Sequence, residues 1–398
     1  MSDRSQKLRR VHATSLSRPR RAVAAVAVVA AALAVVGTLP AAAESHGSRD
    51  VVSKRLERLV TEDRFPAALV ATVDRDGRTR NYTAGVGDLR TGAKVPVDGQ
   101  VRAGSNTKTF TATVVLQLVG EGKVALDSPI ERYLPNLVRG EGIDGNNITV
   151  RQILQHTSGL PNYTDSMLEA VLGKDRHRYY QPRDLLDTAL AHKSEFAPGA
   201  RWSYSNTNYI VAGLLIEKVT GRPLAEQITQ RVIDRIGLRH TYFPGVGDEH
   251  IREAHPQGYH AAKPGAPLEN VTELDPSWGW AAGQLISTPS DLNRFFSALI
   301  GGELLQPSEL AQMRTTVEIP DGPVTGVGGQ YGLGLASTPL SCGGVMWGHG
   351  GDTPGYHTVP GVTDDGRAAT IVVTANMAPT PTGYTDADAV LDTALCKK

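Results

Sequence analysis

The sequence predicts an α+β fold, in which helices flank an antiparallel sheet and a mostly helical segment is inserted. Two hairpin patterns with Asp-Gly turns, near residues 67–84 and 356–374, supply strands at both ends of the chain. Between about residues 125 and 275 the pattern is instead one of helices broken by Pro and Gly. This arrangement indicates one sheet that the C-terminal half completes.

The first 43 residues are expected to be an export signal outside this fold. They hold seven basic residues and one acidic residue, followed by an apolar run at Ala22–Leu39 and small residues up to Ala43. A positive start, an apolar stretch and a small-residue cleavage site are typical of secretory signals. An apolar run of this length is also just long enough to span a bilayer, so a retained anchor is the alternative. We expect cleavage near Ala43, a secreted protein of the cell envelope and no stable membrane anchor.

Residues 44–398 are predicted to form one domain, with an α/β part at about 44–124 and 276–398 and a helical insertion at about 125–275. Without residues 1–43 the chain keeps 34 basic and 40 acidic residues, a net charge of −6. An acidic protein without a basic stripe is a poor candidate for nucleic-acid binding, which we therefore exclude.

The α/β elements follow from local patterns. A short helix near Val52–Val60 precedes a strand at Ala67–Val73, the turn Asp74–Gly77 and a second strand at Arg80–Ala84. Apolar residues at helical spacing predict a helix at Thr107–Val119. The C-terminal half is predicted to hold strands at Gln284–Ser287, Tyr331–Leu335, Gly344–Gly348, Tyr356–Val362 and Ala369–Thr374, and helices at Ser290–Ile300 and Thr385–Leu395.

In the insertion, the clearest helices are expected at Arg183–Ala191, Asn208–Val219 and Leu224–Ile236. They lie between Gly- and Pro-containing breaks, which set their ends.

Ser105 lies at the N-terminus of the helical pattern predicted at Thr107–Val119, and Lys108 follows three residues later. This spacing places both side chains on one helix face, one turn apart. A hydroxyl beside an amine is the minimum for a serine nucleophile that needs no histidine base. At the helix N-terminus the dipole favours developing negative charge, and partial burial would lower the pKa of the lysine. The alternative is a serine cap beside a solvated lysine.

Two later motifs complete the candidate site. Tyr204 and Asn206 flank Ser205 in a polar loop, where a phenol can pass a proton to a leaving group and an amide can hold a substrate carbonyl. His349-Gly350-Gly351 follows a predicted strand, whose N–H groups can form an oxyanion hole with that of Ser105. Each motif alone also fits an ordinary turn, but the three together indicate an active-site serine hydrolase.

Other chemistries have weaker support. The sequence contains no Gly-x-Ser-x-Gly elbow and no His-Glu-x-x-His motif. The five-residue spacing of His250, His255 and His260 fits solvated loop histidines better than metal ligands. Cys342 and Cys396 are predicted to form a disulfide, as expected for an exported protein, with two free thiols as the alternative.

From about Val52 to Cys396 the chain resembles the secreted D-alanyl-D-alanine carboxypeptidases of the serine β-lactamase-like superfamily, which are related to class C β-lactamases and penicillin-binding proteins. The matching runs are Gly104–Lys108, Leu154–Pro161, Tyr204–Asn208, Tyr331–Leu335, Leu340–Gly343 and Gly348-His349-x-Gly351.

The resemblance implies a β-lactamase/transpeptidase-like fold and acylation of Ser105, with Lys108 as base and Tyr204 as proton relay. Asn206 would bind the substrate amide, and the N–H groups of Ser105 and Asp352 would form the oxyanion hole. Electrostatic support for Tyr204 would come from His349, and Trp278 would line the cleft. The resemblance implies no metal or organic cofactor, a monomer, peptidoglycan stem peptides or other small acyl substrates, and β-lactams as inhibitors or substrates.

Two departures bear on the substrate. A site for a terminal carboxylate needs a basic side chain or hydroxyl groups nearby. Here Ala336–Pro339 carries no arginine, and the acid Asp352 follows the His349 motif, where it would repel a carboxylate. Carboxypeptidase activity is therefore the first expectation, and a D-aminopeptidase, an esterase or a β-lactamase is the alternative. A non-catalytic penicillin or peptidoglycan sensor is a minor alternative, because such sensors usually lose a catalytic group and all are present here.

Overall fold

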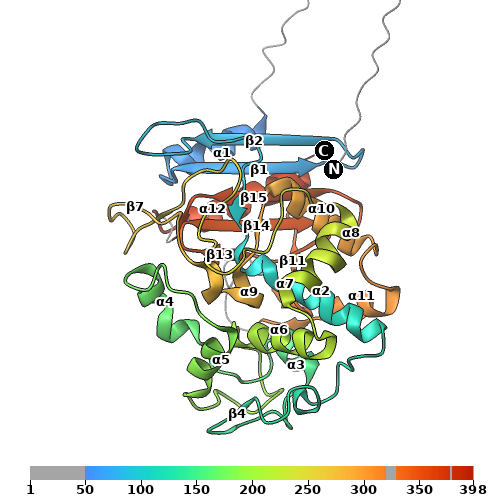
Figure 1. The fold of residues 1–398 in the computed structure, drawn as a ribbon. Coiled ribbons are helices and arrows are strands. Elements are labelled where there is room, and N and C mark those ends of the chain that lie inside the picture. The colour runs from blue at the N-terminus through green and yellow to red at the C-terminus, as the bar shows by residue number, and fades with distance from the viewer. Residues whose placement is uncertain (1–49, 320–328, 377–378, 398) are drawn as a thin grey trace, which may run out of the picture. The chain divides into compact units, whose positions relative to one another are not determined.

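The computed structural model describes residues 50–319, 329–376 and 379–397 (Figure 1). The expected export signal at residues 1–43 therefore lies outside the described residues. The described chain is α+β, as the sequence predicts.

A nine-stranded antiparallel sheet forms the centre of the described part. Its strands run in the order β2 (Thr79–Gly85), β1 (Ala67–Val73), β15 (Ala368–Val373), β14 (Tyr356–Val362), β12 (Val345–Gly348), β11 (Ala336–Pro339), β10 (Gln330–Tyr331) and β9 (Val317–Glu318), with β13 (Gly351–Thr353) paired to β14. Strands β1 and β15 pair in the register Val70↔Ile371, so the C-terminal half completes the sheet that the N-terminal hairpin begins.

Helices cover both faces of this sheet. On one face α1 (Val51–Thr61) and α12 (Gly383–Cys396) pack their apolar residues together against β1, β14 and β15. On the other face lies α10 (Pro289–Ile300), whose Asn293 donates to Ala71 O at 3.0 Å and accepts from Thr370 Oγ1 at 2.8 Å. Because Ala71 and Thr370 are register partners in β1 and β15, this one side chain fixes the helix across two strands.

Helix α2 (Thr107–Gly120) is buried around almost its whole circumference. Its residues from Thr107 to Leu116 are all buried, including Lys108 and four threonines. Its neighbours are α6 (Thr207–Thr220), α7 (Leu224–Ile228), α9 (Trp280–Gly283) and α11 (Pro307–Met313). Residues at its N-terminus are therefore held by elements from both the sheet part and the helical part.

The stretch between residues 125 and 275 is mostly helical, with α3 (Val150–Leu154), α4 (Thr164–Leu172) and α5 (Pro182–Leu190) before α6. The helix expected at Leu224–Ile236 is divided into α7, a π-helical turn at Thr229–Ile233 and α8 (Asp234–Ile236). Two-residue strands make up the remaining elements: β3 (Val101–Arg102) with β8 (Ile286–Ser287), β4 (Arg139–Gly140) with β5 (Ile143–Asp144), and β6 (Tyr259–His260) with β7 (Glu269–Asn270) and β16 (Ala375–Asn376).

The prediction of a strand over Tyr331–Leu335 is wrong in its extent. Strand β10 ends at Tyr331, and the following residues turn the chain into β11. Gly334 adopts φ +75°, a backbone conformation that favours glycine. A Cβ on Gly332 would lie 2.1 Å from Met313 O, so the turn packs tightly against the end of α11.

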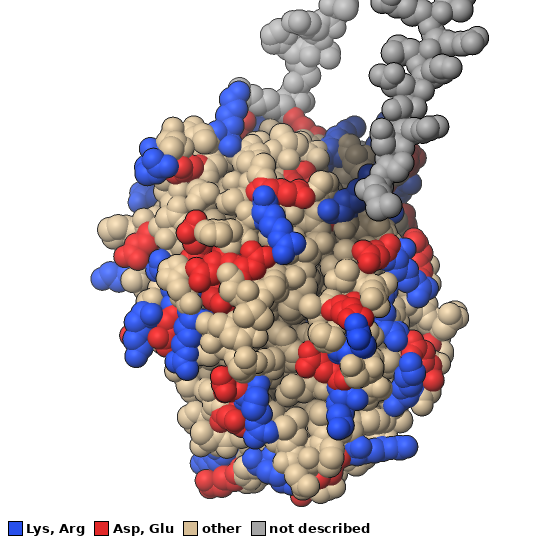
Figure 2. All heavy atoms as spheres, viewed as in Figure 1, with Lys and Arg blue, Asp and Glu red and all other residues tan. Residues whose placement is uncertain are grey.

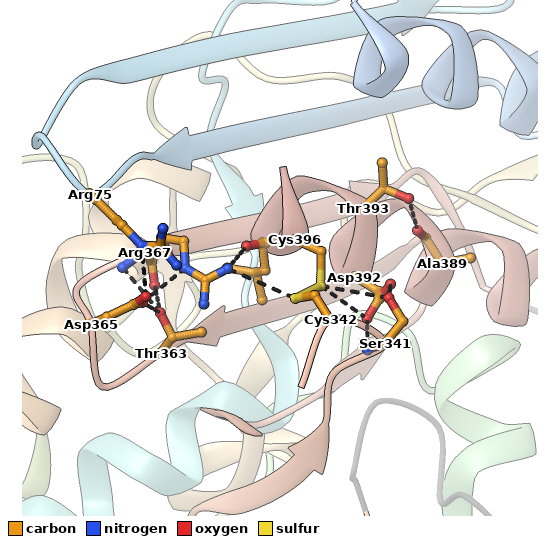
Figure 3. Close-up of a disulfide and its surroundings, with 11 residues drawn as sticks. Arg75, Ser341, Cys342, Thr363, Asp365, Arg367, Ala389, Asp392, Thr393 and Cys396 are labelled. Carbon is orange, nitrogen blue, oxygen red and sulfur yellow. Dashed lines mark hydrogen bonds and ion pairs between the residues drawn. A yellow bond between two sulfur atoms is a disulfide. The ribbon is translucent and has the colours of Figure 1, made fainter. Parts of the chain in front are cut away.

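A disulfide joins Cys342, in the loop before β12, to Cys396 at the end of α12 (Figure 3). Ser341 donates to Asp392 of the same helix at 2.5 Å, and Arg367 donates to the carbonyl of Leu395. These contacts hold the last turn of α12 onto the sheet and confirm the predicted cysteine pairing.

On the face shown in Figure 2, lysine and arginine side chains are interspersed with aspartate and glutamate and form no continuous basic stripe. Among the described residues, no helix is both long enough and apolar enough to cross a membrane.

Candidate active site

Ser105 and Lys108 meet at the N-terminus of α2. Ser105 lies in a single 3₁₀ turn, Gly104–Asn106, that leads directly into the helix, and Lys108 follows in the first helical turn. The Lys108 Nζ lies 2.8 Å from the Ser105 Oγ. The spacing of three residues thus places the amine within hydrogen-bond reach of the hydroxyl.

The surroundings of Lys108 favour a neutral amine. Its side chain is fully buried, and its Nζ also donates to Asn206 Oδ1 at 2.7 Å and to Ala282 O at 2.8 Å. Burial lowers the pKa of Lys108 well below its usual value, and the charge of Asp352 opposes this only in part. A neutral amine satisfies both acceptors with its two N–H groups and turns its lone pair toward Ser105, as a general base requires.

Tyr204 lies beside the same pair. Its ring centroid is 5.0 Å from the Lys108 Nζ, and its hydroxyl interacts with Ser105. Burial raises the pKa of Tyr204 far above its usual value, against the hydrogen bond from Ser105. The phenol therefore keeps its proton near neutral pH and can donate it.

His349 stands behind Tyr204, with 6.3 Å between the ring centroids. Its Nδ1 donates to Gly350 O at 2.6 Å, and its Nε2 accepts from the Tyr331 hydroxyl at 2.9 Å. Burial, and then the charge of Lys108, lower the pKa of His349 to about 3. The ring is therefore neutral near pH 7 and fixes Tyr331 through a hydrogen bond without bringing a positive charge to Tyr204.

Two glycines allow the backbones around Ser105 and Asp352 to approach. Gly104 adopts φ +55°, and a Cβ there would lie 2.8 Å from Asp352 N. A Cβ on Gly351 would lie only 2.0 Å from Ala103 O. The backbone segments that carry the N–H groups of Ser105 and Asp352 therefore face each other, as an oxyanion hole requires.

A cavity of about 240 Å³ opens beside Ser105. Among the described residues that line it, Asp352 is the one with a charged side chain. The lining residues are Ser105, Tyr163, Thr164, Leu168, Leu172, Tyr204, Asn206, Trp278, Gly279, Ala282, Gly283, Gly350, Asp352, Thr353 and Pro354.

The structure brings the sequence-predicted residues together at this cavity. Five of them line it: Ser105, Tyr204, Asn206, Trp278 and Asp352. The other three, Lys108, His349 and Gly351, lie directly behind that lining in the contacts given above.

Sequence reasoning missed the wall formed by α4 and the residue before it. Tyr163 donates to Trp278 O at 2.6 Å, and Leu168 and Leu172 form an apolar side of the cavity. The available signal was the spacing of these two leucines, one helical turn apart, directly after the matched run Leu154–Pro161. Within the described ranges, no group of three or more His, Cys, Asp or Glu is placed to hold a metal ion.

Comparison with known sequences identifies a family. The family model described as Beta-lactamase matches residues 52–395. Protein flp of Staphylococcus aureus (strain N315) is 25% identical over 251 residues, which are 63% of this chain and 49% of that protein. The chain thus spans about half the length of this curated relative.

Comparison with solved structures gives longer coverage. A D-stereospecific amidohydrolase from Streptomyces sp. is 38% identical, with a TM-score of 0.78 over 87% of this chain and 98% of the other. A D-amino acid amidase from Ochrobactrum anthropi SV3, solved with D-phenylalanine, is 26% identical, with a TM-score of 0.76 over 86% and 96%.

Proposed function

The chain belongs to the beta-lactamase family, with its fold and serine-hydrolase chemistry, and on that premise we propose that it hydrolyses amides and short peptides of D-amino acids that carry a free amino group. The acyl-enzyme forms on Ser105. In this proposal the enzyme recognises the ammonium group of its substrate. A carboxypeptidase would instead recognise the terminal carboxylate.

The charge of the cavity carries this proposal. Asp352 is the charged side chain among the described lining residues, and 34% of that side chain is exposed. Such a carboxylate attracts a substrate ammonium and repels a substrate carboxylate. No arginine or lysine stands among the described lining residues to hold a terminal carboxylate.

The apolar walls of the cavity suit a substrate whose acyl part carries a bulky apolar side chain. Leu168 is one of the few large apolar side chains that are exposed among the described residues, at 42%, and it lines this cavity together with Trp278. A volume of about 240 Å³ suits a single amino acid residue better than a long peptide. The similarity to a D-amino acid amidase solved with D-phenylalanine supports the same substrate class.

The reaction follows from the contacts. Ser105 Oγ attacks the carbonyl carbon while its proton passes to neutral Lys108, and the N–H groups of Ser105 and Asp352 stabilise the oxyanion. Tyr204 donates a proton to the leaving nitrogen, and the C–N bond breaks to give the acyl-enzyme. The proton on Lys108 passes back to Tyr204, which restores both groups. Water then attacks the ester carbonyl and gives its proton to Lys108, and the bond from the carbonyl carbon to Ser105 Oγ breaks. Ser105 Oγ takes up that proton, and the D-amino acid is released.

The test compares two p-nitroanilides that differ in one group, D-phenylalanine p-nitroanilide and 3-phenylpropionic acid p-nitroanilide, which lacks the ammonium. We expect kcat/KM to be at least tenfold higher for the first substrate, and no turnover by Ser105→Ala. The matched variant Asp352→Asn keeps the shape of the side chain and should remove most of this preference. Equal turnover of both substrates by the wild type would contradict ammonium recognition.

A D-Ala-D-Ala carboxypeptidase is the second candidate, favoured by Thr353. Thr353 is one of the lining residues of the cavity, and its Oγ1 is buried without a hydrogen-bond partner in the described part of the chain. A hydroxyl of this kind can donate to a substrate carboxylate. Release of D-alanine from a blocked Lys-D-Ala-D-Ala peptide, faster than p-nitroaniline from the D-phenylalanine substrate, would favour this candidate.

We also propose that the protein acts as a secreted monomer and that β-lactams acylate Ser105. A sedimentation measurement on the secreted protein tests whether it is a monomer. A fluorescent penicillin that labels the wild type but not Ser105→Ala would support acylation of Ser105 by β-lactams.

A further inference from the structure

A buried histidine lies directly behind the acid of the cavity. His357 occupies β14 opposite Asp352 of β13, as its register partner. The His357 Nδ1 donates to Asp352 Oδ1 at 2.8 Å. Only 1% of the histidine side chain is exposed, against 34% of the Asp352 side chain. The pair therefore runs from the protein interior to the substrate cavity.

The C-terminal helix encloses the other side of this histidine. The Tyr384 ring stacks on the His357 ring, with 4.3 Å between centroids and 22° between planes. One turn further along α12 stands Asp388, whose Oδ1 is buried. Neither this oxygen nor the His357 Nε2 has a hydrogen-bond partner among the described residues.

Two carboxylates, Asp352 and Asp388, act on the charge of the histidine. Burial lowers the pKa of His357, but the charge and hydrogen bond of Asp352 and then the charge of Asp388 outweigh it, so the net shift is upward. The effect is reciprocal, because His357 lowers the pKa of Asp388 against the larger effect of burial. From the neighbouring strand β15 the register partner of His357 is the uncharged Val373.

A carboxylate that receives a hydrogen bond on one oxygen is restricted in its rotation. Because Oδ1 of Asp352 is engaged by His357, the side chain is held in one orientation at the cavity. Groups that orient a ligand-binding carboxylate in this way raise affinity without touching the ligand.

We propose that His357, supported by Asp388 of α12, is a positioning residue that holds the Asp352 carboxylate in place for the substrate ammonium. This inference rests on the proposed function and deepens it. In this arrangement α12, which the disulfide joins to the loop before β12, contributes to substrate recognition through Asp388.

The experiment measures KM and kcat for the two p-nitroanilides with three variants. His357→Leu fills a similar volume without a donor, and we expect KM for D-phenylalanine p-nitroanilide to rise at least tenfold while kcat changes less than threefold. The substrate that lacks the ammonium should keep its kcat/KM within twofold. His357→Asn retains an N–H near the place of Nδ1 and should keep KM within threefold of the wild type.

Asp388→Asn provides a second, isosteric variant in case His357→Leu does not fold, and it should raise KM severalfold for the ammonium substrate alone. The matched control is Asp386→Asn, an exposed position on the same helix, which should leave both substrates unchanged. If the His357 variants slow both substrates equally, or if KM stays constant in His357→Leu and Asp388→Asn, the inference is wrong.

The two proposals fail in different ways. If the wild type treats both substrates alike, ammonium recognition by Asp352 fails and the positioning role fails with it. If the wild type prefers the ammonium substrate and His357→Leu keeps that preference, the positioning role alone fails.

Discussion

At the residue scale, burial assigns the proton-transfer roles within the catalytic group. It lowers the pKa of Lys108 and raises that of Tyr204. Of the two, the lysine is therefore the group that loses its proton more readily, and the tyrosine keeps one to give. Activity should fall as the pH drops through the lysine's pKa, because a protonated amine accepts no proton.

Tyr204→Phe tests this assignment. We expect kcat to fall by roughly 10²–10⁴-fold, the usual contribution of a general acid, while the acid limb of the kcat/KM profile stays at the wild-type pH. The measurement is a pH profile of D-phenylalanine p-nitroanilide hydrolysis for both proteins. A shift of the acid limb in the variant would mean that the tyrosine, and not the lysine, is the titrating base.

Gly104 is the residue on which the oxyanion hole depends most directly. Its φ of +55° is strained for any other L-residue, and a Cβ would press on Asp352 N at 2.8 Å. Gly104→Ala should therefore lower kcat by about 10²-fold or more, as loss of one oxyanion donor does. Gly245→Ala, where a Cβ has open space and φ is not positive, is the control and should keep full activity. Equal activity of both variants would show that the hole lies elsewhere.

At the element scale, the disulfide is the covalent support of α12. It closes a loop between positions 54 residues apart, for which the restriction of the unfolded chain gives a stabilisation of about 2–4 kcal/mol. In urea titrations, the free energy of unfolding of the double variant Cys342→Ser, Cys396→Ser should be lower than that of the wild type by this amount. It should keep its kcat at 25 °C, because neither cysteine lines the cavity. Reduced wild-type protein should match the variant, and an unchanged midpoint would contradict the prediction.

The same elements show what can be predicted from the sequence. Helix α2 and the β1–β2 hairpin follow from residues close in sequence, so their periodicity and turns locate them within one or two residues. The spacing of Leu168 and Leu172 predicts a helix but not the cavity that it faces, and the His357–Asp352 pair joins two strands. Both placements depend on tertiary contacts that no local pattern encodes. The β10–β11 turn was missed for the same reason, since the packing of Gly332 against Met313 decides it.

At the scale of the whole described molecule, one apolar core crosses the boundary between the α/β part and the helical stretch. Phe110 of α2, Leu215 of α6 and Leu299 of α10 belong to the same buried cluster. The active site is assembled on this core, because Ser105 lies in the turn that leads into α2, Lys108 lies in the first turn of α2, and Asn206 immediately precedes α6. Neither part can bury its share of the cluster alone.

A protein of residues 44–398 should therefore unfold in urea in a single transition, with activity, tryptophan fluorescence and far-ultraviolet circular dichroism lost at the same midpoint. Residues 125–275 expressed alone should not fold, because α2 and α10 supply the other side of their core. The reason is geometric: a helix buried on every side stabilises all of its neighbours at once. Two separated transitions, with activity lost in the first, would instead identify the helical stretch as an independent folding unit that contributes Tyr204 and Asn206 across an interface.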